Sequence, residues 1–82
     1  MKLYVVGVND MIDDEEFTPH CHKQYTVVVN ASSVAVAKHE AINACRREYR
    51  NQLVGDFLEI AWVREKDVEK YNGKGSKLYV SK

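Results

Sequence analysis

The chain has 82 residues, which is enough for one small domain, and we expect a single α+β domain over residues 1–82. A domain of this size buries only about 60–65% of the surface of its unfolded chain. Typical small-molecule pockets need roughly 300–1,000 Å³, so the size favours a binding surface over an enclosed active site. The 12 basic and 12 acidic side chains cancel to a formal net charge of zero, whereas nucleic-acid-binding domains usually carry a basic excess.

Two features of the sequence point to an intracellular protein. Cys21 and Cys45 are the two cysteines, too few for a disulfide framework. The apolar run near the start is too short for a signal peptide, and no run approaches the ~20 apolar residues of a membrane span. We therefore expect a cytoplasmic protein with reduced thiols and no membrane partner. A net charge near zero does little to prevent self-association, which is compatible with a homodimer.

The first half of the chain predicts two strands joined by an irregular loop. Leu3–Val8 is β-branched and aromatic, and it is apolar on both faces, which is typical of an inner strand. Met11–Cys21 has no clear period and is expected to form a loop. Lys23–Asn30 is the second predicted strand. Its expected core side chains are Tyr25, Val27 and Val29.

A helix is predicted from about Ser33 to Asn51. Ser32 or Ser33 can cap its start by accepting a backbone N–H. Mostly small side chains fall within an arc of about 160° on a helical projection; they are Val34, Ala37, Ala41, Ile42, Ala44, Cys45 and Tyr49. A stripe of this kind lets a helix lie close to a sheet. Gly55 is the expected stop or turn residue after the helix.

The last third predicts two more strands and a tight turn. Asp56–Arg64 alternates Leu58, Ile60 and Trp62 with Phe57, Glu59 and Ala61. Asn72-Gly73 is a strong signal for a hairpin tip, and Lys77–Ser81 is the expected fourth strand. Asp67–Tyr71 fits either a strand extension or a helical turn. The fold prediction is a ββαββ arrangement, in which a four-stranded antiparallel sheet carries one central helix on one face.

Acidic and basic side chains are segregated along the chain. Residues 1–22 carry five acids and one base, and residues 23–54 carry five bases and two acids. The acids gather after the first strand, at Asp10, Asp13, Asp14, Glu15 and Glu16. They do not match the calcium-loop pattern. They are either a solvated loop or a negative surface for a partner.

The bases gather at the end of the predicted helix, as Arg46, Arg47 and Arg50. Positive charge suits the helix dipole there, which is a purely structural explanation. Arginine also binds carboxylate and phosphate in bidentate geometry, and nearby tyrosines offer stacking surfaces. The cluster therefore has three interpretations: dipole stabilisation, a protein partner or a nucleic acid.

A metal or thiol site around His20, Cys21 and His22 is the remaining chemical alternative. Zinc takes His and Cys ligands, but consecutive residues of an extended segment point in alternating directions. A catalytic thiol needs a lowered pKa and an orienting base, and no such set is recognisable. The simpler interpretation is a loop with two surface imidazoles and two buried thiols. We expect no metal, no other cofactor and no enzymatic activity.

The stretch from Tyr25 to Ser33, running into Ala35, Ala37 and Ala41, resembles small phage and mobile-element proteins, including some anti-CRISPR inhibitors. In those proteins a strand similarly enters a helix through Ala-Ser and continues with spaced alanines. The resemblance implies an inhibitor that occupies the surface of a host complex. The leading hypothesis is thus a non-enzymatic protein-binding module that uses the charged clusters, and the alternative is a nucleic-acid-binding module.

Overall fold

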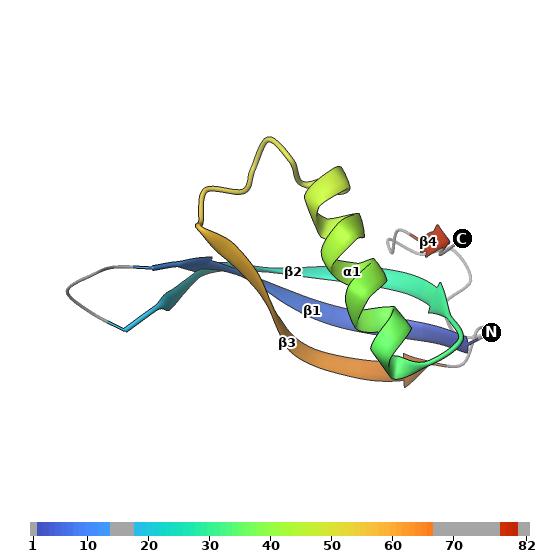
Figure 1. The fold of residues 1–82 in the computed structure, drawn as a ribbon. Helices are drawn as coiled ribbons and strands as arrows, with labels where there is room; N and C mark the ends of the chain where they lie inside the picture. The colour runs from blue at the N-terminus through green and yellow to red at the C-terminus, as the bar shows by residue number, and fades with distance from the viewer. Residues whose placement is uncertain (1, 14–17, 67–77, 81–82) are drawn as a thin grey trace.

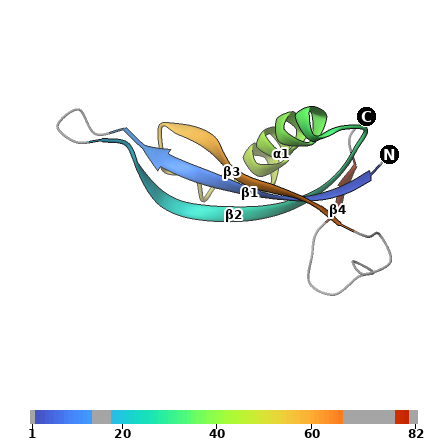
Figure 2. The same ribbon diagram turned by 90° about the horizontal axis from the view of Figure 1, so that it is seen from below.

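The computed structural model describes residues 2–13, 18–66 and 78–80. Its elements follow one another as β1 (Lys2–Ile12), β2 (His20–Ala31), α1 (Val34–Glu48), β3 (Phe57–Lys66) and β4 (Leu78–Val80). The three long strands form a twisted sheet, and α1 crosses one of its faces (Figures 1 and 2). No helix in the described ranges is long and apolar enough to cross a membrane.

β1 is the central strand of the long sheet. It pairs antiparallel with β2 on one side and with β3 on the other, in the order β3-β1-β2-β4. This position explains why β1 is apolar on both faces, as its sequence indicated. β1 and β2 also extend further toward their connection than predicted, because His20–Lys23 continues the ladder.

The predicted four-stranded antiparallel ββαββ sheet is wrong. The antiparallel sheet has three strands, β2-β1-β3, and the short β4 pairs parallel with β2. β4 therefore lies at the opposite edge from β3 and forms no hairpin with it. An Asn-Gly pair favours a tight local turn but does not decide which distant edge the following residues join. The predicted turn at Asn72-Gly73 and the prediction for Asp67–Tyr71 lie outside the described residues.

α1 begins at a serine cap and packs through its small residues. The Ser33 hydroxyl accepts the Val36 N–H at 3.2 Å, as expected for an N-cap. The predicted stripe is largely confirmed, because its buried members are Ala37, Ala41, Ala44 and Cys45. Val34 was wrongly placed in the stripe, since it is the first residue of α1 and 47% of its surface is exposed.

The core lies between α1 and the sheet. The helix-facing side chains of β1 and β2 alternate along the strands and are buried; they are Tyr4, Val6, Val8, Tyr25, Val27, Val29 and Ala31. Leu58, Ile60 and Val63 of β3 pack against this cluster.

A β-bulge in β3 reverses the side-chain alternation. Gly7 lies opposite Trp62 and Val8 lies opposite Ile60, so Ala61 is an extra residue in the ladder. Ile60 and Val63 consequently face the helix, whereas Trp62 packs with Leu3, Val5 and Val28 on the opposite face. The simple alternation predicted for this strand, with Trp62 alongside Ile60, is therefore wrong.

Candidate binding surface at the C-terminal end of the helix

The chain folds back on itself directly after α1. The Tyr49 N–H donates to the Cys45 carbonyl at 2.9 Å, and the N–H groups of Gln52 and Leu53 donate to the Tyr49 carbonyl at 2.8 and 3.1 Å. These bonds satisfy carbonyls that the helix end leaves without partners. The helix therefore stops at Glu48, earlier than predicted, and the following turn stays beside its last residues.

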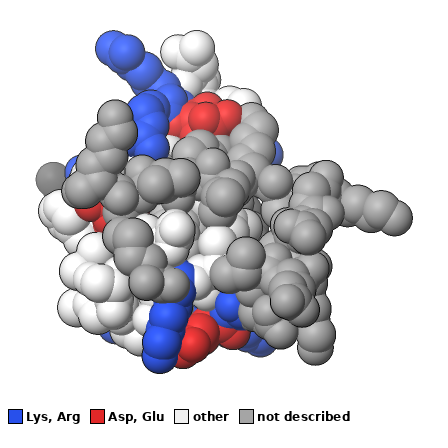
Figure 3. All heavy atoms as spheres, turned by 90° about the vertical axis from the view of Figure 1, so that its right-hand side faces the viewer, with Lys and Arg blue, Asp and Glu red and all other residues white. Residues whose placement is uncertain are grey.

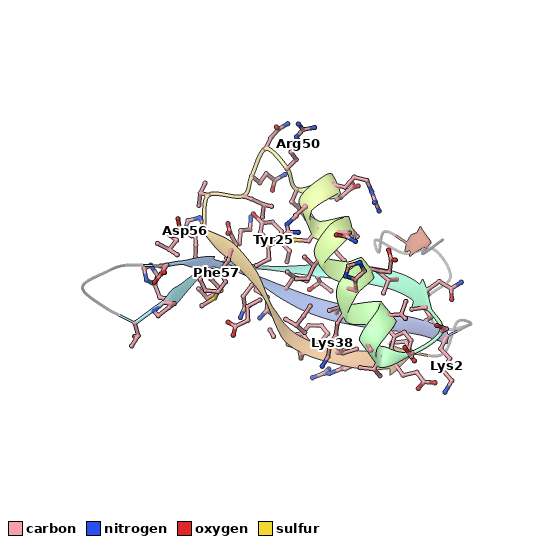
Figure 4. All side chains as sticks on the ribbon, in the orientation of Figure 1. Lys2, Tyr25, Lys38, Arg50, Asp56 and Phe57 are labelled. Atoms are coloured by element: carbon pink, nitrogen blue, oxygen red, sulfur yellow. The ribbon has the colours of Figure 1, made fainter. Side chains whose placement is uncertain are left out.

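The three predicted arginines come together at this end of the molecule. They line a shallow, open concavity of about 520 Å³ together with one amide and one apolar side chain. We call this set the arginine surface: Asn43, Arg46, Arg47, Arg50 and Leu53. All three arginines are exposed, and Arg50 lies at the far tip of the turn in Figure 4.

Among the described residues, the positive charge of the arginine surface is only partly neutralised. The described residues that line it include no Asp or Glu. Arg47 interacts within the chain, but Arg46 and Arg50 form no salt bridge in the described ranges. The salt bridge of Lys2 Nζ with Glu65 Oε1, at 3.5 Å, lies at the other end of the molecule. On that end, the described basic and acidic side chains are interspersed (Figure 3).

A buried carboxylate fixes the loop beneath the arginine surface. Asp10 is 1% exposed, and its two oxygens accept the N–H groups of Val54 and Gly55, each at 3.0 Å. A Cβ at Gly55 would overlap Asp10 Oδ1 and the Met11 carbonyl, so this close approach requires glycine. Residues 54 and 55 are thereby held to β1, more than forty positions earlier in the chain.

A second backbone contact extends this anchor. The Asp56 N–H donates to the Met11 carbonyl at 2.7 Å, and Asp56 Oδ2 accepts the Asp13 N–H at 2.8 Å. The loop is thus held to β1 and Asp13 through three consecutive residues, Val54 to Asp56. Asp56 and Phe57 mark the point where it enters β3 (Figure 4).

A smaller depression of about 120 Å³ adjoins the arginine surface. It shares Arg46 and Leu53 with the larger one, and its other lining residues are Asp10, Gly55, Asp56, Phe57 and Leu58. Phe57 is 40% exposed at its rim, and the neighbouring Val54 is 63% exposed. Exposed apolar side chains therefore flank the arginines on the loop side.

Two tyrosines pack inside the same end of the molecule. The rings of Tyr25 and Tyr49 lie 4.4 Å apart between centroids and are tilted by 34°. The Tyr25 hydroxyl donates to the Gln52 carbonyl at 3.4 Å. Burial, with a smaller contribution from the Asp10 charge, raises the pKa of Tyr25. Tyr25 and Tyr49 thus support the turn from below, and Tyr25, which is buried, offers no stacking face to a ligand.

Only part of the predicted acidic cluster can be placed. Asp13 is exposed at the end of β1 and contacts Asp56 through its backbone. Asp14, Glu15 and Glu16 lie outside the described residues. Asp10, grouped with them by sequence, is instead buried on the helix side of the sheet.

The His20, Cys21 and His22 group lies on β2, not in a loop. All three side chains are exposed, and no group of three His, Cys, Asp or Glu suited to a metal occurs among the described residues. Of the two thiols predicted to be buried, Cys45 is buried but Cys21 is exposed. Burial raises the pKa of Cys45 to about 11, opposite to what a nucleophilic thiolate needs.

Sequence reasoning missed the structural role of Asp10. The signal was present, because Asp10 continues the alternation of Val6 and Val8 and so belongs to their helix-facing side. A carboxylate on a core face requires hydrogen-bond donors, which Val54 and Gly55 supply.

Comparison of the chain with protein-family models, with curated proteins and with solved structures finds no match in any of the three. Nothing among them supports the phage and anti-CRISPR resemblance, which stays a prediction.

Proposed function

We propose that this is a non-enzymatic binding protein whose arginine surface receives an acidic segment of a protein partner. The observation that carries the proposal is the gathering of Arg46, Arg47 and Arg50, all exposed, around one open concavity with no described carboxylate in its lining. Guanidinium groups bind carboxylates with paired, parallel hydrogen bonds. An acidic side chain supplies a counter-charge to Arg46 and Arg50, which form no salt bridge in the described ranges.

The stabilisation of the helix dipole does not by itself account for the arrangement. Arg46 and Arg47 lie in the last turn, where cations interact favourably with the helix end. Arg50 lies beyond the helix, on the turn, and faces the same concavity. A third cation at this place adds repulsion in the free protein, and that repulsion is relieved when an anion binds.

The surroundings favour a protein over a nucleic acid. Interface cores are enriched in aromatic residues and arginine, and Phe57 and Val54 expose apolar surface beside the cluster. Nucleic-acid-binding domains usually carry a basic excess, whereas the net charge of this chain is zero.

Charge reversal tests the proposal directly. Arg46→Glu combined with Arg50→Glu should weaken binding of a fluorescein-labelled poly-glutamate peptide by roughly tenfold or more, measured by fluorescence polarisation at low salt. Lys38→Glu is the matched control, because Lys38 is exposed on the same helix but near its other end (Figure 4).

Two results would contradict the proposal. One is equal weakening by Lys38→Glu, which would show a general charge effect. The other is tighter, steeply salt-dependent binding of a single-stranded oligonucleotide, which would favour the nucleic-acid-binding module instead.

A further inference from the structure

β3 forms one edge of the sheet and is long enough to pair with another strand. It has ten residues, no proline, and only β1 beside it in the described part of the sheet. An edge strand of this kind presents unpaired N–H and C=O groups that can extend the sheet across molecules. We propose that β3 pairs antiparallel with β3 of a second copy, so that the two sheets become one.

The bulge at Ala61 selects the register of this pairing. Residues directly opposite each other in an antiparallel ladder must point to the same face. Consider a two-fold axis that is perpendicular to the sheet and passes between two neighbouring residues. In a regular strand, this axis would place side chains that point to opposite faces across from each other. In β3 the extra residue shifts the alternation, so the opposing side chains on the two sides of the axis point to the same face.

Only an axis between Ala61 and Trp62 matches faces along the whole strand. Ile60 and Val63 both face the helix side, and they become cross-strand neighbours. Trp62 lies on the other side, and alternation puts Glu59 and Arg64 there as well. If the axis is moved by one residue in either direction, the two residues paired next to it point to different faces, one toward the helix and one away from it.

This register is complementary in charge and in shape. Glu59 of each copy lies opposite Arg64 of the other, which gives two opposite-charge pairs related by the two-fold axis. Glu59 and Arg64 are both exposed in the single chain. Ile60 and Val63, which are partly buried, meet their counterparts on the helix side. β-branched pairs and opposite charges are favourable cross-strand neighbours.

The same features exclude other strands. A bulge and charged side chains normally protect an edge from indiscriminate pairing. An unrelated flat strand has no bulge of its own, so its side-chain alternation would fall out of step with that of β3. A second copy presents both the matching bulge and the matching charges. The net charge of zero adds no general repulsion between copies.

Charge exchange across the axis tests the proposal. Sedimentation of the whole chain over a series from micromolar to roughly millimolar concentration should show a monomer–dimer equilibrium. Glu59→Arg and Arg64→Glu, each alone, place like charges opposite one another and should weaken dimerisation by about tenfold. The double variant Glu59→Arg/Arg64→Glu should restore it. An equimolar mixture of the two single variants should form the heterodimer in preference to either homodimer.

Other results would overturn the proposal. A wild-type chain that stays monomeric throughout the series excludes the pairing. Single variants that both dimerise as strongly as the wild type, or a double variant as weak as the singles, would place the contact elsewhere. Circular dichroism confirms that each variant is folded, and Lys38→Glu, a charge reversal on α1 and not in β3, should dimerise as the wild type does.

Discussion

The two faces of the sheet solve the packing problem in different ways. On the helix side, small residues let α1 lie close, and Ala37, Ala41 and Cys45 are fully buried against valines. On the other side, Trp62 packs with Leu3, Val5 and Val28 and lies over Gly7, where a Cβ would overlap its indole ring. The first face depends on many interlocking small contacts, whereas the second contains a glycine–tryptophan contact that a side chain at position 7 would disrupt.

Polar groups also differ between the faces. The helix side contains one buried carboxylate, Asp10, which bonds to backbone N–H groups. On the other side the Trp62 Nε1–H donates to Gln24 Oε1 at 3.2 Å, and Gln24 Nε2 donates to Asn9 Oδ1 at 2.8 Å. The Arg64 guanidinium lies 5.2 Å from the Trp62 ring centroid. Water cannot replace the buried hydrogen bonds of Asp10, whereas it can replace the exposed hydrogen bonds of Gln24. Loss of the Asp10 side chain should therefore lower the stability of the fold more than loss of the Gln24 side chain.

The largest effect is expected from Asp10→Ala. It removes both acceptors from the N–H groups of Val54 and Gly55 and leaves a cavity, which should lower the free energy of unfolding by about 3 kcal/mol, measured by urea denaturation. Asp56→Ala is the control, because its carboxylate is exposed and its loss should cost less than about 1 kcal/mol. Equal losses in the two variants would mean that burial does not distinguish these carboxylates.

Gly7→Val tests the opposite face and should have a smaller effect. The new side chain must displace the Trp62 ring, at a cost of about 2 kcal/mol. Trp62 is the only tryptophan, so its fluorescence should shift to longer wavelength as the ring moves toward water. Thr26→Val, at the position paired with Gly7 on β2, introduces the same side chain without the clash. An unchanged emission spectrum in Gly7→Val would show that the ring does not depend on this glycine.

The smallest effect at neutral pH concerns Cys45. Its pKa is raised in the folded protein to about 11 from 9.0, chiefly by burial, so the neutral thiol is the form that the fold accepts. The unfolded chain ionises first as the pH rises, and the stability contributed below pH 9 should be lost between about pH 9 and 11. Thermal melts of Cys45→Ala should lack this component. A decline of the same size in the variant would show that groups other than Cys45 cause it.

Local patterns in the sequence predicted the elements but not all of their pairings. A continuous apolar run located β1, alternation located β2 and β3, and Ser33 with the alanines located the helix and its buried side. The partner of β4 could not be predicted, because both sheet edges were open to it. The position of Trp62 was wrong for a related reason: a bulge is a property of two paired strands, and no residue of Phe57–Lys66 signals it alone.

The candidate site was predicted as a set of residues but not as a surface. Arg46, Arg47 and Arg50 were identified by their spacing, and their shared concavity depends on the turn formed by Tyr49 and Leu53. That turn is held by Asp10, which lies far away in the sequence. Charge counts reveal which side chains are available, whereas the contacts that bring them together are long-range.

The central position of β1 sets the order in which the molecule can assemble. Its pairing with β2 is local and can form once Ala31, the partner of Lys2, has been synthesised. Its pairing with β3 places Leu3 opposite Lys66, so one edge of β1 in the newly made hairpin remains unpaired until residues up to Lys66 have been synthesised. Contacts this distant in sequence slow the final folding step. The newly made protein is therefore most prone to aggregation before β3 docks.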